Sequence, residues 1–201
     1  LEAIPERTVG DLLMDKPSQA ERAVVASEYE NLYVVGASHT LTGTAELLSI
    51  RVRREVRLSK ALQALDYDYV LLDSAPTEGI LTHNVITAAD LLLVPVQMGG
   101  GAIEGVEPLL ELAIELRDGE EMPYRLLLTM LDRRTTRTNT TVRDRLRKHR
   151  KNFLKTYIGK SERVNQANLE SKPIIAHSSG ARGVREYDAL AKDIVAVAQR
   201  L

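Results

Sequence analysis

The chain has 201 residues, of which 44% are hydrophobic and 27% are charged, so it is long and apolar enough to bury a core of its own. The absence of cysteine excludes disulfides, thiolate nucleophiles and cysteine-ligated zinc or iron–sulfur centres. No apolar run reaches the roughly 18 residues that would indicate a membrane-spanning helix.

The formal net charge of −1 conceals a strong segregation of charge along the chain. Between residues 133 and 163, twelve Lys and Arg residues stand against only Asp144 and Glu162. A basic stretch of this kind is the usual footprint of a protein that binds a polyanion. A solvated helix with surface ion pairs is the alternative, but two acidic residues are too few to neutralise the stretch.

Short apolar runs alternate with longer stretches of helical periodicity, and each is expected to form one element. In chain order the predicted elements are a strand at 32–35, a helix at 44–65, a strand at 69–72, a helix at 81–89, a strand at 91–96, a helix at 103–117, a strand at 125–130, a helix at 140–153, a short strand at 174–175 and a closing helix at 184–201. Strands that are apolar on both faces indicate a mostly parallel sheet with helices on both faces. We therefore predict a single α/β domain over residues 1–201.

The predicted helix at 140–153 carries much of the basic stretch. Its apolar stripe is Val142, Leu146, His149 and Phe153, so His149 is predicted to be a core or boundary residue. The cations between these positions are then expected to point outward; they are Arg143, Arg145, Arg147, Lys148, Arg150 and Lys151.

In such sheets, ligands bind beyond the carboxyl ends of the strands, where Asp73 follows the apolar run 69–72. A carboxylate at this position can hold a magnesium-bound water or orient an attacking water. An aspartate that only caps a turn is the alternative.

The order of several motifs resembles the ParA family of deviant Walker-type partition ATPases, which are relatives of MinD. Residues 68–79 (D-Y-V-L-L-D-S-A-P-T-E-G) resemble the family's Walker B and switch II motifs. Further matches are T-A-A-D at 87–90, V-P-V-Q at 94–97, A-I-E-G at 102–105, L-T-M-L-D-R-R-T at 128–135, K-P-I at 172–174 and G-A-R-G at 180–183. The resemblance covers about residues 8–195 and implies a fold like that of P-loop NTPases.

The family's phosphate loop, K-G-G-x-G-K-[ST], is expected to precede Leu1, so the chain as given is expected to lack the first strand and that loop, and to be inactive by itself. The stretch 155–161 (K-T-Y-I-G-K-S) contains two lysines in a similar pattern. However, Thr156 and Tyr157 stand where glycines are needed, so it is not expected to bind phosphate. A second departure is G-K-S-E-R at 159–163, where the family has P-R-N-x-R on the adenine side.

The resemblance also implies roles for individual residues. Asp73 would be the catalytic Walker B carboxylate that acts on Mg²⁺ through water. The residues expected to contact ATP are Pro76, Thr77 and Gly79 in the switch and Thr129, Met130 and Asp132 near adenine. Core packing is the alternative for Met130. The residues expected to contact DNA are Arg134, Lys160, Arg163 and Arg182, with solvated surface charge as the alternative for each.

The function implied is that of a partition ATPase for plasmids or chromosomes. An ATP-bound homodimer would bind double-stranded DNA non-specifically, and a ParB-like centromere-binding protein would stimulate hydrolysis. The protein would be cytoplasmic and associated with the nucleoid, without membrane contact. Two alternatives remain: a DNA-binding or scaffold protein without ATPase activity, and a MinD-like membrane-associated ATPase, which would require a basic amphipathic helix at the C-terminus.

Overall fold

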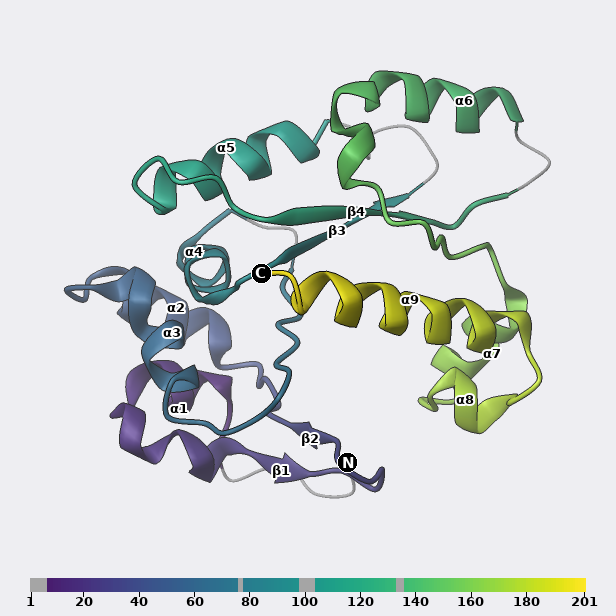
Figure 1. The fold of residues 1–201 in the computed structure, drawn as a ribbon. Coiled ribbons are helices and arrows are strands. Elements are labelled where there is room, and N and C mark those ends of the chain that lie inside the picture. Colours follow the sequence, from purple (N-terminus) through teal and green to yellow (C-terminus); the bar gives the residue numbers. More distant parts are fainter. Residues whose placement is uncertain (1–6, 76–77, 98–103, 133–135) are drawn as a thin grey trace. The chain divides into compact units, whose positions relative to one another are not determined.

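The computed structural model describes residues 7–75, 78–97, 104–132 and 136–201, and its elements are labelled in Figure 1. The chain forms two compact units, one of residues 1–89 and the other of residues 90–201. Within the described ranges, no helix combines the length and the apolar composition needed to cross a bilayer.

The first unit consists of short helices and one small sheet. Its elements are α1 (Val9–Met14), the 3₁₀-helix η1 (Pro17–Ala23), β1 (Val25–Ala26), β2 (Tyr33–Val34), α2 (Leu41–Ser49), the 3₁₀-helix η2 (Arg54–Val56), α3 (Arg57–Leu62) and α4 (Ile80–Ala88). Leu12, Leu13, Leu48, Leu58 and Ile80 form its apolar core, contributed by helices α1 to α4. Burial of these side chains, rather than strand pairing, stabilises this unit.

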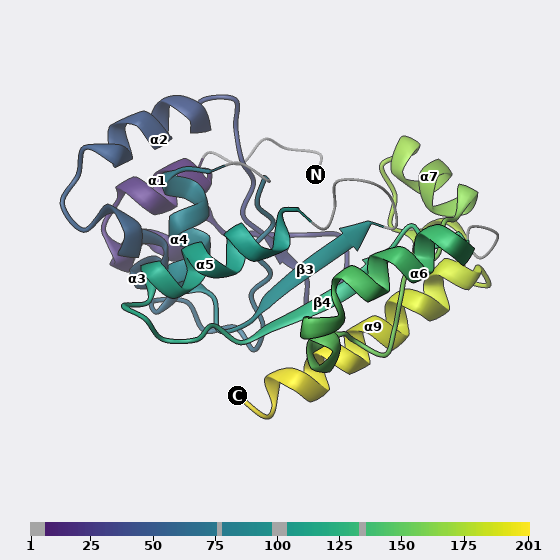
Figure 2. The ribbon, with the colours of Figure 1, turned by 90° about the horizontal axis from the view of Figure 1, so that it is seen from above.

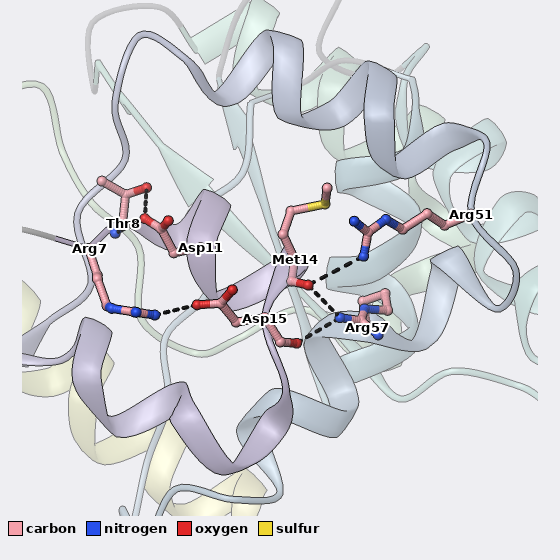
Figure 3. A network of polar contacts seen from close by, with 7 residues as sticks. All are labelled: Arg7, Thr8, Asp11, Met14, Asp15, Arg51 and Arg57. Carbon is pink, nitrogen blue, oxygen red and sulfur yellow. Dashed lines mark hydrogen bonds and ion pairs between the residues drawn. The ribbon is translucent and has the colours of Figure 1, made fainter.

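Arg57 closes the carboxyl end of α1 (Figure 3). Its Nη2 donates to the carbonyls of Met14 at 3.0 Å and Asp15 at 2.7 Å. Its Nε donates to the carbonyl of Leu13 at 2.9 Å. These are carbonyls that the last turn of a helix leaves without partners. At the other end of α1, the backbone N–H of Thr8 donates to Asp11 Oδ2 at 2.7 Å.

Asn84 makes a second set of polar contacts in this unit, and it is 1% exposed. Its Oδ1 accepts from the backbone N–H of Leu58 at 3.0 Å, and its Nδ2 donates to the carbonyls of Arg54 and Ile80, each at 2.8 Å. Every hydrogen of the amide nitrogen is thereby used, so burial of this side chain carries little penalty.

Three sequence predictions are wrong in this unit. The predicted helix at 44–65 is divided into α2, η2 and α3, because the chain turns after Ser49 and Arg53 adopts a left-handed φ of 53°. The predicted strand at 32–35 is reduced to β2, which pairs antiparallel with β1 rather than in a parallel sheet. The predicted strand at 69–72 has no regular structure, and its Leu71 is 87% exposed.

The second unit is built on parallel strands. Strand β3 (Leu92–Gln97) pairs with β4 (Tyr124–Thr129) in a register that runs from Leu92↔Tyr124 to Gln97↔Thr129. On the other side of β4, residues 153–160 run parallel to it, with bridges at Leu126↔Phe153 and Leu131↔Gly159. β4 therefore has neighbours on both sides, and Leu126, at its centre, is 0% exposed.

Helices cover both faces of this sheet (Figures 1 and 2). Helices α5 (Val106–Leu116) and α6 (Thr136–Arg145) lie on one face, and α9 (Arg182–Ala198) lies on the other. Leu190 of α9 packs with Leu127 of β4 and with Ile158. The remaining elements are the 3₁₀-helix η3 (Arg147–Asn152), α7 (Glu162–Leu169) and α8 (Ile174–His177).

The predictions for the second unit are mostly confirmed. The strands at 91–96 and 125–130 and the helices at 103–117 and 184–201 appear as β3, β4, α5 and α9, shifted by one to three residues at their ends. The predicted helix at 140–153 is divided into α6 and η3, although Val142, Leu146 and His149 are buried as expected. The predicted strand at 174–175 is wrong, because these residues begin the short helix α8 directly after Pro173.

Candidate functional site

The carboxyl end of β4 carries three of the residues expected near adenine. Thr129 ends the strand and is half-buried, and Asp132 is half-buried three residues later. Met130 lies between them with a left-handed φ of 54° and is 39% exposed. A left-handed backbone is uncommon for a residue with a side chain and is often found at ligand sites. The turn leaves the flexible Met130 side chain partly open to solvent.

The segment 153–160 brings Lys160 to this same end of β4. The backbone N–H of Leu154 donates to the carbonyl of Leu126 at 3.0 Å, and that of Ile158 donates to Leu128 at 2.8 Å. Beyond the end of the strand, the N–H of Lys160 donates to the carbonyl of Leu131 at 3.1 Å. Lys160 is exposed and directly precedes Ser161, which caps helix α7.

Arg182 is held against Gly159 by Glu186. Glu186 Oε2 accepts from the backbone N–H of Gly159 at 2.9 Å, and its Oε1 accepts from Arg182 Nε at 2.5 Å. The Arg182 guanidinium occupies the space that a Cβ at position 159 would need. Glu186 could not be assigned from the sequence, because an acid four residues after an arginine is common on helices.

These contacts also confirm that the stretch 155–161 does not form a phosphate loop. Its amides at Gly159 and Lys160 already bond to the Glu186 carboxylate and the Leu131 carbonyl, and the N–H of Thr156 bonds to Asp193 at 3.0 Å. A phosphate loop needs its amides free and directed at one anion.

Asp73 and Gly79 lie in the first unit. Asp73 is exposed and belongs to a segment without helix or strand. Gly79 precedes α4 with a φ of 151°, a conformation that residues with a side chain rarely adopt. Pro76 and Thr77 lie outside the described residues. The structure describes Asp73 and Gly79 within the first unit and the carboxyl end of β4 within the second unit, each by itself.

The cations of the basic stretch are exposed wherever the structure describes their side chains. On α6, η3 and the following segment these are Arg145, Arg147, Lys148, Arg150, Lys151 and Lys155. Lys148 Nζ pairs with Glu107 Oε1 at 2.6 Å. On α7, Arg163 is exposed and donates from Nη1 to Ser178 Oγ at 3.1 Å. Arg134 and the side chain of Arg143 lie outside the described part of the chain.

Comparisons with known proteins find relatives over most of the chain. The family model described as an AAA domain matches residues 3–126. The sporulation initiation inhibitor protein Soj of Bacillus subtilis is 35% identical over 196 residues, which cover 95% of this chain and 77% of Soj. The chromosome partitioning protein ParA of Myxococcus xanthus is 31% identical over 189 residues, covering 92% of this chain and 66% of that protein. The chain belongs to the Soj/ParA family.

Solved structures show the fold that this Soj/ParA chain shares. The apo structure of McdA from Cyanothece has a TM-score of 0.76 at 18% identity, with 93% of this chain and 77% of McdA covered. Cobyrinic acid a,c-diamide synthase of Mycobacterium smegmatis, with bound ATP analog and magnesium, has a TM-score of 0.63 at 29% identity, with 79% and 66% covered. The fold is therefore like that of P-loop NTPases, with a parallel sheet and flanking helices, as the sequence predicted.

Proposed function

We propose that this Soj/ParA chain belongs to an ATP-dependent partition switch. In this proposal, two copies assemble when ATP is bound, hold duplex DNA without reading its sequence, and release it when a ParB-type partner stimulates hydrolysis. The observation that carries the proposal is the row of exposed cations on α6, η3 and the segment up to Lys155. The family relationship supports the ATPase part, because the relatives include proteins named as chromosome-partitioning ATPases.

The composition of the basic stretch favours binding to a DNA duplex over binding to a single strand. Arginine and lysine contact backbone phosphates in any sequence, whereas single strands are usually held by stacking on aromatic rings. Between residues 133 and 163 the aromatic residues are Phe153 and Tyr157, and both are half-buried. We propose that Lys160, Arg163, Arg182 and Arg134 also contact DNA, as the family resemblance implies.

The residues present are chemically suited to Mg²⁺ and ATP. Asp73 is an exposed carboxylate followed by the hydroxyl of Ser74, and Mg²⁺ prefers oxygen ligands of this kind. When bound, magnesium would neutralise charge on the phosphates. Met130 would offer an apolar wall to adenine and Asp132 an acceptor for its amine. Pro76, Thr77 and Gly79 would form the switch, in which Gly79 supplies the backbone freedom at the start of α4.

Assembly into a dimer would make DNA binding depend on nucleotide. Two basic surfaces held together bind one duplex far more tightly than either does alone, because the second contact becomes intramolecular. We also propose that the two units are parts of one α/β domain, since the family model runs from residue 3 to residue 126 across the boundary at residue 89. Binding to nucleoid DNA would place the protein in the cytoplasm at the nucleoid.

Nucleotide-dependent DNA retention tests the proposal. The full-length protein is mixed with a duplex of arbitrary sequence in the presence of ATP or ADP, and retention is measured over a series of salt concentrations. We expect retention with ATP only, and an affinity that falls steeply with salt. Retention that is equal with ATP and ADP, together with the absence of hydrolysis, would instead favour a scaffold without ATPase activity.

A further inference from the structure

His149 differs from its neighbours on the basic 3₁₀-helix η3. Its side chain is 8% exposed, whereas Arg147, Lys148, Arg150 and Lys151 are exposed. A buried histidine within a run of exposed cations needs polar partners, because a buried ring nitrogen without one is costly.

Both ring nitrogens of His149 have such partners. Nε2 lies 2.5 Å from Glu107 Oε1, and Nδ1 lies 2.7 Å from the Tyr124 hydroxyl. The carboxylate can only accept, so Nε2 carries the hydrogen, and in the neutral ring Nδ1 accepts from the tyrosine O–H. The Tyr124 ring also meets the imidazole edge-on, with centroids 5.8 Å apart.

The charged groups around this contact keep Glu107 an acceptor. Lys148 and His149 bond to its carboxylate and hold the pKa of Glu107 below its usual range. Burial raises the pKa of Tyr124, with Glu107 and Glu121 adding to this effect and Asn152 and Lys148 opposing it. Tyr124 therefore keeps its hydroxyl hydrogen over the whole range in which the protein would work.

The three residues come from three different elements. Glu107 lies in the first turn of α5, Tyr124 is the first residue of β4, and His149 lies in the middle of η3. The contact therefore ties the basic 3₁₀-helix to the central strand and to a covering helix. Val142 and Leu146, which are 3% and 1% exposed, fix the chain just before it.

We propose that the Glu107–His149–Tyr124 contact is a positioning anchor that holds the cations of η3 in one fixed array against the phosphates of duplex DNA. The inference rests on the proposed function and adds residues that do not themselves touch DNA. A short 3₁₀-helix has poor internal hydrogen bonds and needs support from outside. Without the anchor, its backbone and cations would have to be ordered at the moment of binding, which costs affinity.

The anchor makes a prediction that separates it from a simple loss of charge. His149→Leu keeps every cation of η3, so the dependence of affinity on salt should stay as in the wild type, while affinity at fixed salt falls by about fivefold. Tyr124→Phe removes one hydroxyl and should lower affinity by about twofold to threefold. His149→Gln restores a donor and an acceptor and should recover most of the loss.

Lys151→Gln is the comparison for loss of charge. It removes a cation and should reduce the slope of log affinity against log salt by about 0.9.

The measurements are DNA retention of the full-length protein with ATP over a salt series, and hydrogen exchange of amides 147–152. His39→Leu, at an exposed position in the first unit, serves as the control for loss of a histidine. The proposal requires faster exchange in His149→Leu and Tyr124→Phe together with weaker DNA binding. Wild-type affinity in both variants would overturn the proposed anchor but not the proposed function. If His149→Leu does not fold, Tyr124→Phe alone tests the anchor. A wild-type protein that retains no DNA would overturn the proposed function and the anchor with it.

Discussion

The apolar runs at residues 126–128 and 69–72 both precede an aspartate, Asp132 in the first case and Asp73 in the second, yet their environments differ. The first run lies in β4 between two parallel neighbours, and Leu126 is completely buried. The second has no regular structure, and Leu71 is 87% exposed. Apolar composition alone does not make a strand, because a buried strand also needs backbone partners along its length. The contrast can be tested at several positions.

The largest expected effect is at the centre of β4. Leu126→Ala should lower the free energy of unfolding by about 2–5 kcal/mol, because it leaves a cavity among closely packed neighbours. Leu71→Ala should change it by no more than about 0.5 kcal/mol, as expected for an exposed side chain. Urea unfolding of both variants measures the difference. Equal losses would mean that residues 69–72 are buried in solution.

The two aspartates should differ in their effect on ATP hydrolysis. Asp73→Asn removes the carboxylate proposed to act on magnesium and should lower kcat by about a hundredfold, equivalent to roughly 2.7 kcal/mol. Asp132→Asn alters the proposed contact with adenine and not the proposed magnesium site, so KM should rise by up to about tenfold with kcat little changed. Steady-state assays of the full-length protein provide the comparison. Normal turnover in Asp73→Asn would assign that residue to a structural turn.

The segment beside β4 should be more sensitive to added volume than an open loop. Gly159→Ala places a methyl group where the Arg182 guanidinium lies and should cost about 1–3 kcal/mol. Gly180→Ala is the matched control, because a Cβ there meets nothing within 4 Å. Thermal unfolding of Gly159→Ala with and without Arg182→Ala measures the coupling. If Arg182→Ala brings no relief, the arginine does not occupy that space in solution.

A smaller effect is expected from Asp11 in the first unit, which should make the stability of the protein depend on pH. The backbone N–H of Thr8 bonds to Asp11 and lowers the pKa of that carboxyl below its ordinary value of 3.8. A lowered pKa in the folded state stabilises the protein above pH 3.8, and this contribution is lost as the pH falls through the folded value. Wild type should therefore be more stable than Asp11→Asn at pH 6, and the difference should shrink below about pH 4. A difference that does not change with pH would contradict the role of this bond.

The sequence predicted the second unit better than the first because its apolar runs find their partners within the same unit. The stripe of Val142, Leu146 and His149 is buried as expected even though the helix is divided at Leu146, since 3₁₀ and α geometry place residues three or four apart on similar faces. The prediction of a strand at 69–72 is wrong because strand pairing depends on distant segments, which a local pattern does not contain. Two isoleucines after Pro173 are too short a pattern to distinguish a strand from a helix.

Part of the candidate site could also be predicted from the sequence. Motif order placed Thr129, Met130 and Asp132 together at the end of a strand, and β4 ends there. Glu186 and Glu107 could not be predicted, because single carboxylates on helices carry no pattern that distinguishes a bonded one from a solvated one. The roles of Asp73, Gly79 and the DNA-contacting cations stay predictions.

The three bonds from Arg57 to the end of α1 have a consequence for local motion. A six-residue helix has too few hydrogen bonds to persist alone, so α1 depends on a side chain more than forty positions away. If α3 frays and withdraws that guanidinium, the carbonyls of Leu13 and Asp15 lose their donors together, and that of Met14 keeps only the Nη1 of Arg51, at 3.3 Å. Amide protons of α1 and α3 should therefore exchange with solvent in a single cooperative opening event, at a rate that Arg57→Leu would increase for both helices.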